Sequence, residues 1–469
     1  MNAPLSNPIF RLIGQTAAEC GCRAYVIGGF VRDCLLGRPL GDIDVVVTGS
    51  GIEVAERLGK KVRAKVSVFK NFGTASLKTK GLELEFVGAR KESYRADSRN
   101  PSVECGSLED DQNRRDFTIN AMAFSLNDDD FGTLVDPFDG MSDLQNGIIR
   151  TPLDPDTTFS DDPLRMVRAI RFATQLDMRI TDECMESIRR NRERIAIISR
   201  ERITTETRKI ICSSTPSRGF FLFDKTGLLE LIYPDLHRLK GVEKRDGRAH
   251  KDNFIHTLKV LDNVARSGGD EWLRWAALLH DIAKPRTKAW DNRIGWTFHN
   301  HEFVGSRMVR GIFNAWRLPL DHKMKFVEKM VLLHLRPIVL ADEGVTDSAV
   351  RRLLFDAGDD TEALMTLCRA DITSGNGEKV ARYLRNFDLV EQKMRQIEEK
   401  DRIRNFQPPI TGQMIMQTYG LPPCAEVGQI KNAIKDAILD GVIDNDYSQA
   451  YELMVKIAAE IIPDKKPLP

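Results

Sequence analysis

The sequence predicts an α+β protein whose strands are concentrated in the first third of the chain. Two apolar runs at residues 25–27 and 43–47 flank a Gly28-Gly29 turn. Period-two alternation, typical of antiparallel strands, recurs in three stretches: residues 65–69, 74–79 and 82–87. From Thr157 onward the apolar residues recur at helical spacing. We therefore expect a head with a mixed or antiparallel sheet, followed by all-α domains.

Composition narrows the functional classes. The chain has 469 residues, of which 42% are hydrophobic and 29% charged, and this size predicts two to four domains. The net charge of +1 excludes a global basic field, so an RNA site would have to be a local patch. We expect no signal peptide and no membrane span, because no apolar run approaches about 20 residues. Eight cysteines without CxxC pairs predict reduced thiols and a cytoplasmic protein.

The first candidate site lies between the two leading strands. Asp42 and Asp44 open the second strand, and alternate strand positions face the same way. Two carboxylates beside a glycine turn at a helix start suit Mg²⁺ ions that hold a triphosphate. The alternative is a capped turn with solvated acids, which the glycine turn, Arg32 and the β-rich run that follows disfavour. Glu85, in a later strand, could add a third carboxylate or be a surface acid.

Two further segments of the first half bear on a site. Residues 90–112 are polar and turn-rich, which is typical of a functional flexible loop or of disorder. Residues 189–209 are rich in arginine, which fits either a solvated helical surface or an RNA-backbone contact. Helices are expected at residues 8–22, 52–58, 181–190 and 199–212.

Asp162 and Arg165 begin a predicted helix whose arginines at 165, 168 and 171 share one face. Cytosine and adenine both present an amino donor beside a ring-nitrogen acceptor, so a carboxylate and a guanidinium could pair with either base. Uracil and guanine would leave mispaired groups, each at a cost of ~1–3 kcal/mol. The alternative is an ordinary ion pair between an aspartate at a helix N-terminus and an arginine three residues later.

Five segments, in order, resemble the motifs of class II tRNA nucleotidyltransferases, the CCA-adding enzymes of the polymerase-β-like superfamily. They lie within residues 20–215 and read GGFVRDCLLGRPLGDIDVVV, RRDFTINAMAF, DPFDGMSDLQNGIIRTP, DDPLRMVRAIRF and ERITTETRKI. The family often has Glu-Asp where this chain has Asp161-Asp162. The change affects only the first residue, and Asp162, which pairs with the base in the family, is retained.

This resemblance implies a polymerase-β-like head and a role for each matching residue. Asp42 and Asp44 would hold Mg²⁺, with Glu85 as the third carboxylate. The residues implied at the nucleotide are Gly29, Arg32 and Arg115 at the triphosphate, Asp116 and Asn120 at the ribose, Asp162 and Arg165 at the base, and Arg168 and Arg171 around them. The implied activity is the addition of CCA to the 3′ end of tRNA without a nucleic-acid template, from CTP and ATP with release of pyrophosphate.

A second constellation lies in the helical part. An adjacent His-Asp pair inside the apolar stretch AALLHDIAKP is hard to explain as packing, because a buried charge needs a partner. The pattern resembles an HD-type metal phosphohydrolase domain. In that pattern one metal, a divalent transition metal or Mg²⁺, would be held by His256, His280, Asp281 and Asp371, and His301 and His334 would complete a second site bridged by Asp281. Lys284 could reach a phosphate. Similar fused domains have phosphatase or 2′,3′-cyclic phosphodiesterase activity, and a fold retained without activity is the alternative.

We expect four domains. They are a catalytic head at 1–150, a helical neck with the templating motif at 151–235, an HD domain at 236–385, and a C-terminal helical RNA-binding region at 386–469. The segment from residue 410 to 443 resembles the C-terminal region of HD-fused CCA-adding enzymes.

Other functions stay open at this stage. A bacterial poly(A) polymerase shares the catalytic motifs, and an enzyme that adds only CC or only A would share them too. From another class, the protein could be an HD phosphohydrolase whose front half binds RNA, which intact Asp42, Asp44 and Arg165 disfavour. A non-enzymatic RNA-binding scaffold fits least, because both constellations are complete.

Overall fold

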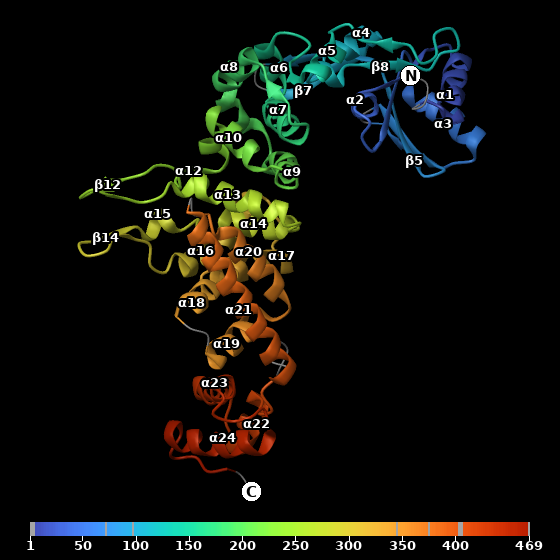
Figure 1. Ribbon diagram of the computed structural model, residues 1–469. Helices are drawn as coiled ribbons and strands as arrows, with labels where there is room; N and C mark the ends of the chain where they lie inside the picture. Colours follow the sequence, from blue (N-terminus) through green and yellow to red (C-terminus); the bar gives the residue numbers. More distant parts are fainter. Residues whose placement is uncertain are drawn as a thin grey trace. The chain divides into compact units, whose positions relative to one another are not determined.

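The protein is described here by a computed structural model of residues 5–70, 73–95, 98–343, 346–373, 376–401 and 407–467. It divides into two compact units, Met1–His237 and Arg238–Pro469 (Figure 1). The first unit combines a sheet with helices, and the second is helical apart from two short hairpins. The predicted α+β class is therefore confirmed.

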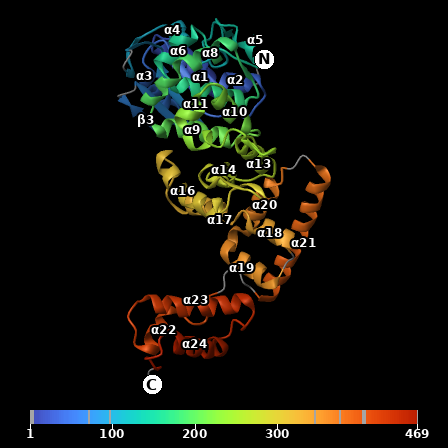
Figure 2. The same cartoon turned by 90° about the vertical axis from the view of Figure 1, so that its left-hand side faces the viewer.

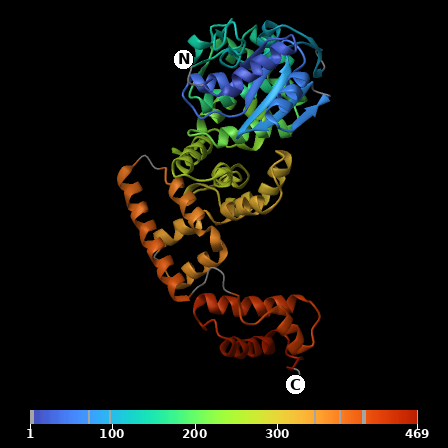
Figure 3. The same cartoon turned by 90° about the vertical axis from the view of Figure 1, so that its right-hand side faces the viewer.

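A seven-stranded mixed sheet forms the centre of the first unit, and its first strands are the blue arrows in Figure 3. Their spatial order is β3 (Val66–Phe69), β4 (Thr74–Thr79), β5 (Leu82–Gly88), β2 (Ile43–Val47), β1 (Ala24–Ile27), β8 (Ala123–Ser125) and β9 (Leu134–Val135). The β2–β5 pair is parallel, and the other neighbours are antiparallel. All four residues of β1 are buried, so the strand that precedes the glycine turn lies in the core.

Helices α1 (Pro8–Glu19) and α3 (Gly51–Val62) pack against each other and against the sheet. Each begins at a side-chain cap, because Asn7 accepts from the Ile9 amide and Ser50 accepts from the Glu53 amide. Their buried faces hold Phe10, Ile13, Ala17, Val54, Ala55 and Leu58. Two of the predicted helices therefore exist and support the sheet.

The prediction of a loop or disorder over residues 90–112 is wrong for the residues that are described. Strands β6 (Arg90–Arg95) and β7 (Ser98–Cys105) pair as an antiparallel hairpin, and helix α4 (Leu108–Asn113) follows. Residues 96 and 97 lie outside the described part. Backbone hydrogen bonds can hold a two-stranded ribbon together without an apolar face. A ribbon of polar sequence therefore lacks the period-two alternation from which strands are predicted.

The remainder of the first unit is helical. Its helices are α2 (Gly29–Leu35) after β1, then α5 (Gly140–Asn146), α6 (Pro155–Asp161), α7 (Leu164–Gln175), α8 (Asp182–Asn191), α9 (Arg200–Ile211), α10 (Ser217–Lys225), α11 (Leu228–Ile232) and α12 (Pro234–His237). Short strands β10 (Ile148–Ile149) and β11 (Arg179–Ile180) pair in parallel. Helix α7 packs against α9, and its residues Arg165 and Arg168 line a cavity together with residues of the sheet.

The second unit begins with hairpin β12 (Lys244–Arg245) and β13 (Arg248–Ala249). Its helices are α13 (Asn253–Arg266), α14 (Glu271–Leu279), α15 (Lys284–Thr287), α16 (His301–Ala315), α17 (His322–Leu333), α18 (Arg336–Glu343), α19 (Asp347–Ala357), α20 (Thr361–Asp371), α21 (Gly377–Asp401), α22 (Gly412–Tyr419), α23 (Ala425–Asp440) and α24 (Tyr447–Ile461). A second hairpin, β14 (Ala289–Asp291) and β15 (Gly295–Thr297), lies between α15 and α16.

Two groups of contacts organise this unit. Helices α13, α14, α17 and α20 pack together around buried Trp275, Leu278 and Val331. Helices α22, α23 and α24 form a separate group near the C-terminus (Figure 2). Arg352 on α19 joins that group to the rest of the unit, because it pairs with Asp436 at 3.2 Å and Asp440 at 2.8 Å. No helix within the described ranges is both long and apolar enough to cross a bilayer.

Candidate active sites

The sheet places two of the predicted catalytic carboxylates side by side. Asp44 on β2 is paired in register with Glu85 on the parallel strand β5, so both side chains lie on one face. Asp42 lies just before β2 and is exposed. Burial raises the pKa of Asp44, Arg115 opposes that rise, and the charges of Glu85 and Asp42 add to it. The face therefore carries negative charge that a cation would stabilise.

Gly28 leaves space beside Arg115 and Asp44. It has φ +81°, a conformation that favours glycine, and it precedes α2. A Cβ at Gly28 would lie 3.0 Å from the Arg115 guanidinium and 3.5 Å from the Asp44 carboxylate. A side chain there would crowd both groups, and the positive φ would add backbone strain, so glycine suits this position.

A cavity of about 340 Å³ opens over this face, a size that suits a small ligand. The sheet contributes Asp44, Thr74, Glu85 and Val87, and β6 contributes Arg90. The opposite wall is formed by Arg114, Arg115, Asp116, Asp162, Leu164, Arg165, Arg168 and Arg202. Four acids and six arginines thus line the cavity, which suits a ligand that carries anionic groups and is bound together with metal ions.

Asp111 fixes the two arginines that enter the cavity from α4. Its side chain is fully buried and accepts from Arg114 Nε at 2.9 Å and from Arg115 Nη2 at 3.0 Å. Two guanidiniums on one carboxylate are held in place, so little conformational entropy is lost when they bind an anion.

Asp116 is the centre of a buried network. It accepts from Asn120 Nδ2 at 3.0 Å and from Arg168 Nε at 2.7 Å. Burial would raise the pKa of Asp116, but Arg168 and Asn120 outweigh burial and hold it at about 2. Asn120 in turn accepts from Arg32 Nη1 at 2.7 Å, and Asp33 pairs with the same guanidinium at 2.9 Å. The network links α2, the segment after α4 and α7 into one rigid unit.

Asp162 and Arg165 both line the cavity. Asp162 has extended backbone before Pro163, as the residue before a proline prefers, and this separates α6 from α7. Its carboxylate lies 3.3 Å from Arg202 Nη2 on α9. Arg165 donates to the Arg114 carbonyl at 2.6 Å and to the Thr158 carbonyl at 3.4 Å. These contacts hold both side chains at the cavity wall.

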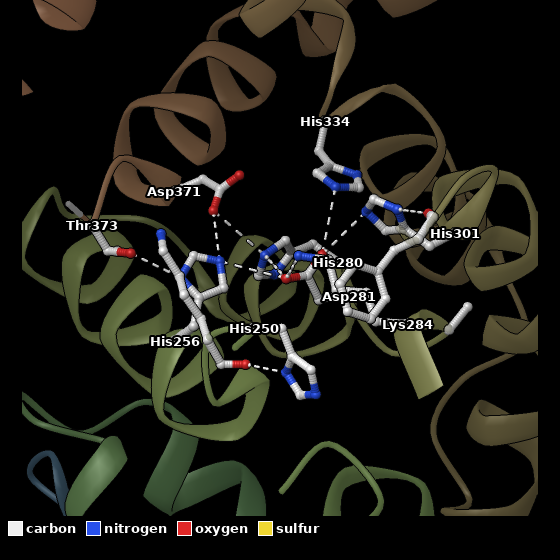
Figure 4. Close-up of polar contacts among 12 residues, drawn as sticks. His250, His256, His280, Asp281, Lys284, His301, His334, Asp371 and Thr373 are labelled. Carbon is white, nitrogen blue, oxygen red and sulfur yellow. Dashed lines mark hydrogen bonds and ion pairs between the residues drawn. The ribbon is translucent and has the colours of Figure 1, made fainter. Parts of the chain in front are cut away.

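In the second unit, all six predicted HD ligands converge on one point (Figure 4). The ligand atoms of His256, His280 and Asp371 lie within 4.8 Å of one another, and so do those of Asp281, His301 and His334. Asp281 lies between the two groups. Its Oδ2 is 3.2 Å from His280 Nε2, and its Oδ1 is 3.2 Å from His301 Nε2. One carboxylate therefore faces both groups, as a bridging ligand would.

Hydrogen bonds at Nδ1 fix the orientation and the tautomer of three of the histidine rings. His280, His301 and His334 place Nδ1 at 2.7–2.8 Å from backbone carbonyls of Ala277, Phe298 and Val331. A carbonyl can only accept, so Nδ1 carries the hydrogen and the neutral ring presents a lone pair at Nε2. Those three Nε2 atoms are buried and have no hydrogen-bond partner within the described part of the chain. Orphaned lone pairs directed at two carboxylates fit a metal centre.

The electrostatics of the cluster agree with this assignment. Burial alone would raise the pKa of Asp281 and Asp371, yet the pKa of each is lowered, for Asp281 mainly by His280 and for Asp371 by its bonds to His256 and His280. Burial would lower the pKa of His280, but the two aspartates raise it to about 10, so its ring carries a hydrogen at Nε2 until a metal ion takes that place. Burial and the adjacent His280 lower the pKa of His334 to about 3. The two aspartates are thus ionised at neutral pH and attract cations.

Comparison with known proteins decides the family. Family models match at residues 24–150 for the poly A polymerase head domain, 177–240 for the probable RNA and SrmB-binding site of polymerase A, and 253–376 for the HD domain. A multifunctional CCA protein of Methylococcus capsulatus is 32% identical over 367 residues, which are 74% of this chain and 81% of that protein. This chain belongs to the CCA-adding enzyme family.

Other members of the family extend the comparison. An A-adding tRNA nucleotidyltransferase of Aquifex aeolicus is 49% identical over 159 residues, 34% of this chain and 19% of that protein. The chain spans half or less of several such relatives. The crystal structure of the Bacillus stearothermophilus CCA-adding enzyme with CTP has a TM-score of 0.70 and 24% identity, and it covers 98% of this chain and 99% of that chain, so it shares the fold.

The structure of this CCA-family member separates the predicted nucleotide residues into two sets. Asp44, Glu85, Arg115, Asp116, Asp162, Arg165 and Arg168 line the cavity. Asp42, Gly29, Arg32, Asn120 and Arg171 are not among the residues that line it, and Asp42 is exposed. Arg171 is buried and pairs with buried Glu206 at 2.7 Å, and burial lowers its pKa to about 10. Within the described ranges, two groups of three potential metal ligands have their ligand atoms within 4.8 Å of one another, and both lie in the second unit. The carboxylates of Asp42, Asp44 and Glu85 in the head are therefore more widely spaced than this.

Sequence reasoning missed several residues at these sites. Asp111 and Arg114 belong to LEDDQNRRD, where acids one helical turn before two arginines could have indicated an ion pair. Arg202 lies in the arginine-rich segment, but nothing in its spacing points to Asp162. Thr373, whose Oγ1 lies 2.8 Å from His256 Nδ1, also gave no signal.

Proposed function

We propose that this chain is a tRNA nucleotidyltransferase that adds C, C and A to the 3′ end of tRNA from CTP and ATP, with release of pyrophosphate. The observation that supports this most is the cavity that combines the Asp44–Glu85 face with the Asp162–Arg165 wall. A site that only bound triphosphates would not require a carboxylate and a guanidinium placed at the far wall. A site that only bound RNA would not require clustered carboxylates.

The carboxylates of Asp42, Asp44 and Glu85 would hold Mg²⁺, which suits oxygen ligands and neutralises charge at the phosphates during transfer. Arg115, fixed by Asp111, would orient the triphosphate over this face, with Gly29 and Arg32 beside it. The 3′ hydroxyl of the RNA would attack the α-phosphate in line, so the protein contributes position and electrostatics, and no covalent intermediate.

The far wall would choose the base. Asp162 would accept from the amino group of cytosine or adenine, and Arg165 would donate to the neighbouring ring nitrogen. Arg202, 3.3 Å from Asp162, would hold that carboxylate in place. The ribose would lie near Asp116 and Asn120, whose bond to each other and to Arg168 limits their movement. Arg171 would act indirectly, through the packing of α7 on α9.

We also propose that the HD cluster is a metal-dependent phosphohydrolase centre that acts as a phosphatase or 2′,3′-cyclic phosphodiesterase. Its ligands would be His256, His280, Asp281, His301, His334 and Asp371. Four imidazoles favour a divalent transition metal, although Mg²⁺ is also considered. A bound metal would lower the pKa of a water molecule and make it a nucleophile at neutral pH. Lys284, which lies 2.7 Å from Asp281, would contact a phosphate oxygen.

The domain assignment follows from these sites. The head would span 1–150, the neck 151–235, the HD domain 236–385 and the C-terminal RNA-binding region 386–469. The partners would be tRNA, CTP and ATP. All eight cysteines are free thiols, which is consistent with the cytoplasm as the compartment.

A specialised A-adding enzyme is the second candidate, and the 49% identity to an A-adding relative over 159 residues favours it. Three tRNA primers separate the candidates when their products are sized: one ends at the discriminator base, one at C and one at CC. Full CCA addition extends each primer to the same end and stops. An A-adding enzyme extends only the CC primer by one residue, and a poly(A) polymerase continues past three. Failure to extend any primer would refute the proposal.

A further inference from the structure

The two hairpins of the second unit form one surface. In Figure 1, β12 and β14 project from the same side of the unit, and β13 contacts β15. Arg248 Nη1 donates to the Arg293 carbonyl at 2.6 Å, and Lys288 pairs with Glu243 at 2.5 Å. These contacts join the hairpins side by side, although they are about 40 residues apart in the sequence.

A row of ring contacts with a cation at each end runs along this surface. The Phe298 ring contacts the His250 ring at 5.8 Å between centroids, and His250 contacts Trp296 at 5.6 Å. Trp296 contacts Trp290 at 5.1 Å, and the Arg245 guanidinium lies 5.0 Å over the Trp290 ring. At the other end, Lys284 lies 5.7 Å from Phe298. The aromatic–basic strip consists of Lys284, Phe298, His250, Trp296, Trp290 and Arg245.

The strip begins at the metal cluster. Lys284 donates to the bridging carboxylate of Asp281 at 2.7 Å, and the Phe298 carbonyl accepts from His301 Nδ1 at 2.7 Å. Two residues of the strip therefore contact proposed metal ligands directly. A ligand lying along the strip would have one end at the cluster.

The surroundings of the strip are strongly basic. Residues 238–252 and 284–299 contain ten lysines and arginines and four acids, in a chain whose net charge is +1. The residues of the first hairpin are exposed, and Trp290, Trp296 and Phe298 are half-buried. Trp296 Nε1 is a buried donor without a hydrogen-bond partner among the described residues. The strip thus offers aromatic rings and positive charge.

We propose that the aromatic–basic strip binds single-stranded RNA and directs its terminal phosphate to the metal cluster. The proposal rests on the phosphohydrolase function proposed above, and the strip lies outside the match to an RNA-binding region at residues 177–240. Unpaired bases stack on aromatic rings while lysines and arginines neutralise the backbone phosphates. A duplex would hide its base faces, and an acidic peptide would leave the rings without a partner.

Photo-crosslinking tests the strip without requiring turnover. The full-length protein, treated with EDTA, is irradiated with an RNA hexamer that carries 4-thiouridine near its 3′ end, and the crosslinked peptides are identified. We expect crosslinks on the two hairpins that fall at least fivefold in Trp290→Ala/Arg245→Ala. The matched control is Trp272→Ala/Lys323→Ala, another cation–π pair of the same unit with 5.1 Å between its groups, and it should keep them.

Kinetics provide the second measurement. The substrates are the same hexamer with a terminal 2′,3′-cyclic phosphate and a mononucleoside 2′,3′-cyclic phosphate, assayed with a panel of divalent metals. Trp290→Ala/Arg245→Ala should raise KM for the hexamer about tenfold, near the lower range for base–aromatic stacking. Its kcat and its hydrolysis of the mononucleotide should stay unchanged.

The outcomes distinguish the strip from the phosphohydrolase. If wild-type protein hydrolyses neither substrate but the hairpin crosslinks form, the phosphohydrolase function fails and the strip stands. If hydrolysis occurs but crosslinks map away from the hairpins, the strip is overturned. Equal competition by an RNA duplex or by polyglutamate would also overturn it.

Discussion

Replacement of Asp116 by asparagine removes a buried negative charge and keeps the shape of the side chain. Asp116 is 7% exposed and accepts from Arg168 and Asn120, and these partners hold its pKa at about 2 against burial and an ordinary value of 3.8. A depression of about two units is worth about 2–3 kcal/mol of stability at neutral pH. Because the pKa is lower in the folded state, this stabilisation is present above pH 3.8 and is lost as the pH falls toward 2.

Hydrogen exchange of the β1 and β8 amides measures the stability of the first unit directly. We expect Asp116→Asn to lower the free energy of opening by about 2–3 kcal/mol at pH 7 and by clearly less at pH 3. All five tryptophans lie in the second unit, so the midpoint of the unfolding transition followed by tryptophan fluorescence should not change. Asp129→Asn is the control, since its ion pair with Arg23 at 2.9 Å is exposed and should contribute little. An unchanged opening free energy at pH 7, or a difference that persists undiminished at pH 3, would refute the reasoning.

Three further predictions concern the two sites. Asp42→Ala should lower nucleotide incorporation by at least 10³-fold while tRNA binding, measured by filter retention, is kept; retained incorporation would exclude a metal role. Exchange of the base-reading pair, as Asp162→Arg/Arg165→Asp, should remove the preference for CTP and ATP in single-nucleotide extension, and an unaltered preference would exclude base reading by this pair. Asp281→Asn should reduce the metal bound per chain, measured by elemental analysis, and leave CCA addition unchanged; an undiminished metal content would contradict the bridging assignment.

Features with a local sequence pattern were predicted better than contacts between residues far apart in the chain. Period-two alternation placed Glu85 in a strand where it could join Asp44, and the register of β2 and β5 makes them neighbours. The adjacent His280 and Asp281 indicated a buried polar cluster from an apolar context alone. In both cases the sequence signal is local: alternation within one strand for Glu85, and an adjacent polar pair in an apolar stretch for His280 and Asp281.

Other features depend on contacts that no local pattern encodes. Arg202 meets Asp162 from a helix 40 residues away, and buried Glu206 meets Arg171 in the same way. The sequence of the β6–β7 hairpin is polar, so it shows no alternation of apolar residues, and the strands are recognised only from their backbone pairing. The buried contacts of Arg32 with Asp33 and Asn120 also had no signal in the sequence, because Asn120 lies 88 residues away. Each of these depends on how separate elements pack.

Nucleotide binding in the absence of RNA tests the central claim most directly, since the claim is that protein side chains choose the base. Equilibrium binding of CTP, ATP, UTP and GTP to the full-length protein with Mg²⁺ measures this choice without a template. CTP and ATP should bind at least tenfold more tightly than UTP and GTP, as one mispaired buried group costs ~1–3 kcal/mol. Equal affinity for all four nucleotides would contradict base selection by Asp162 and Arg165.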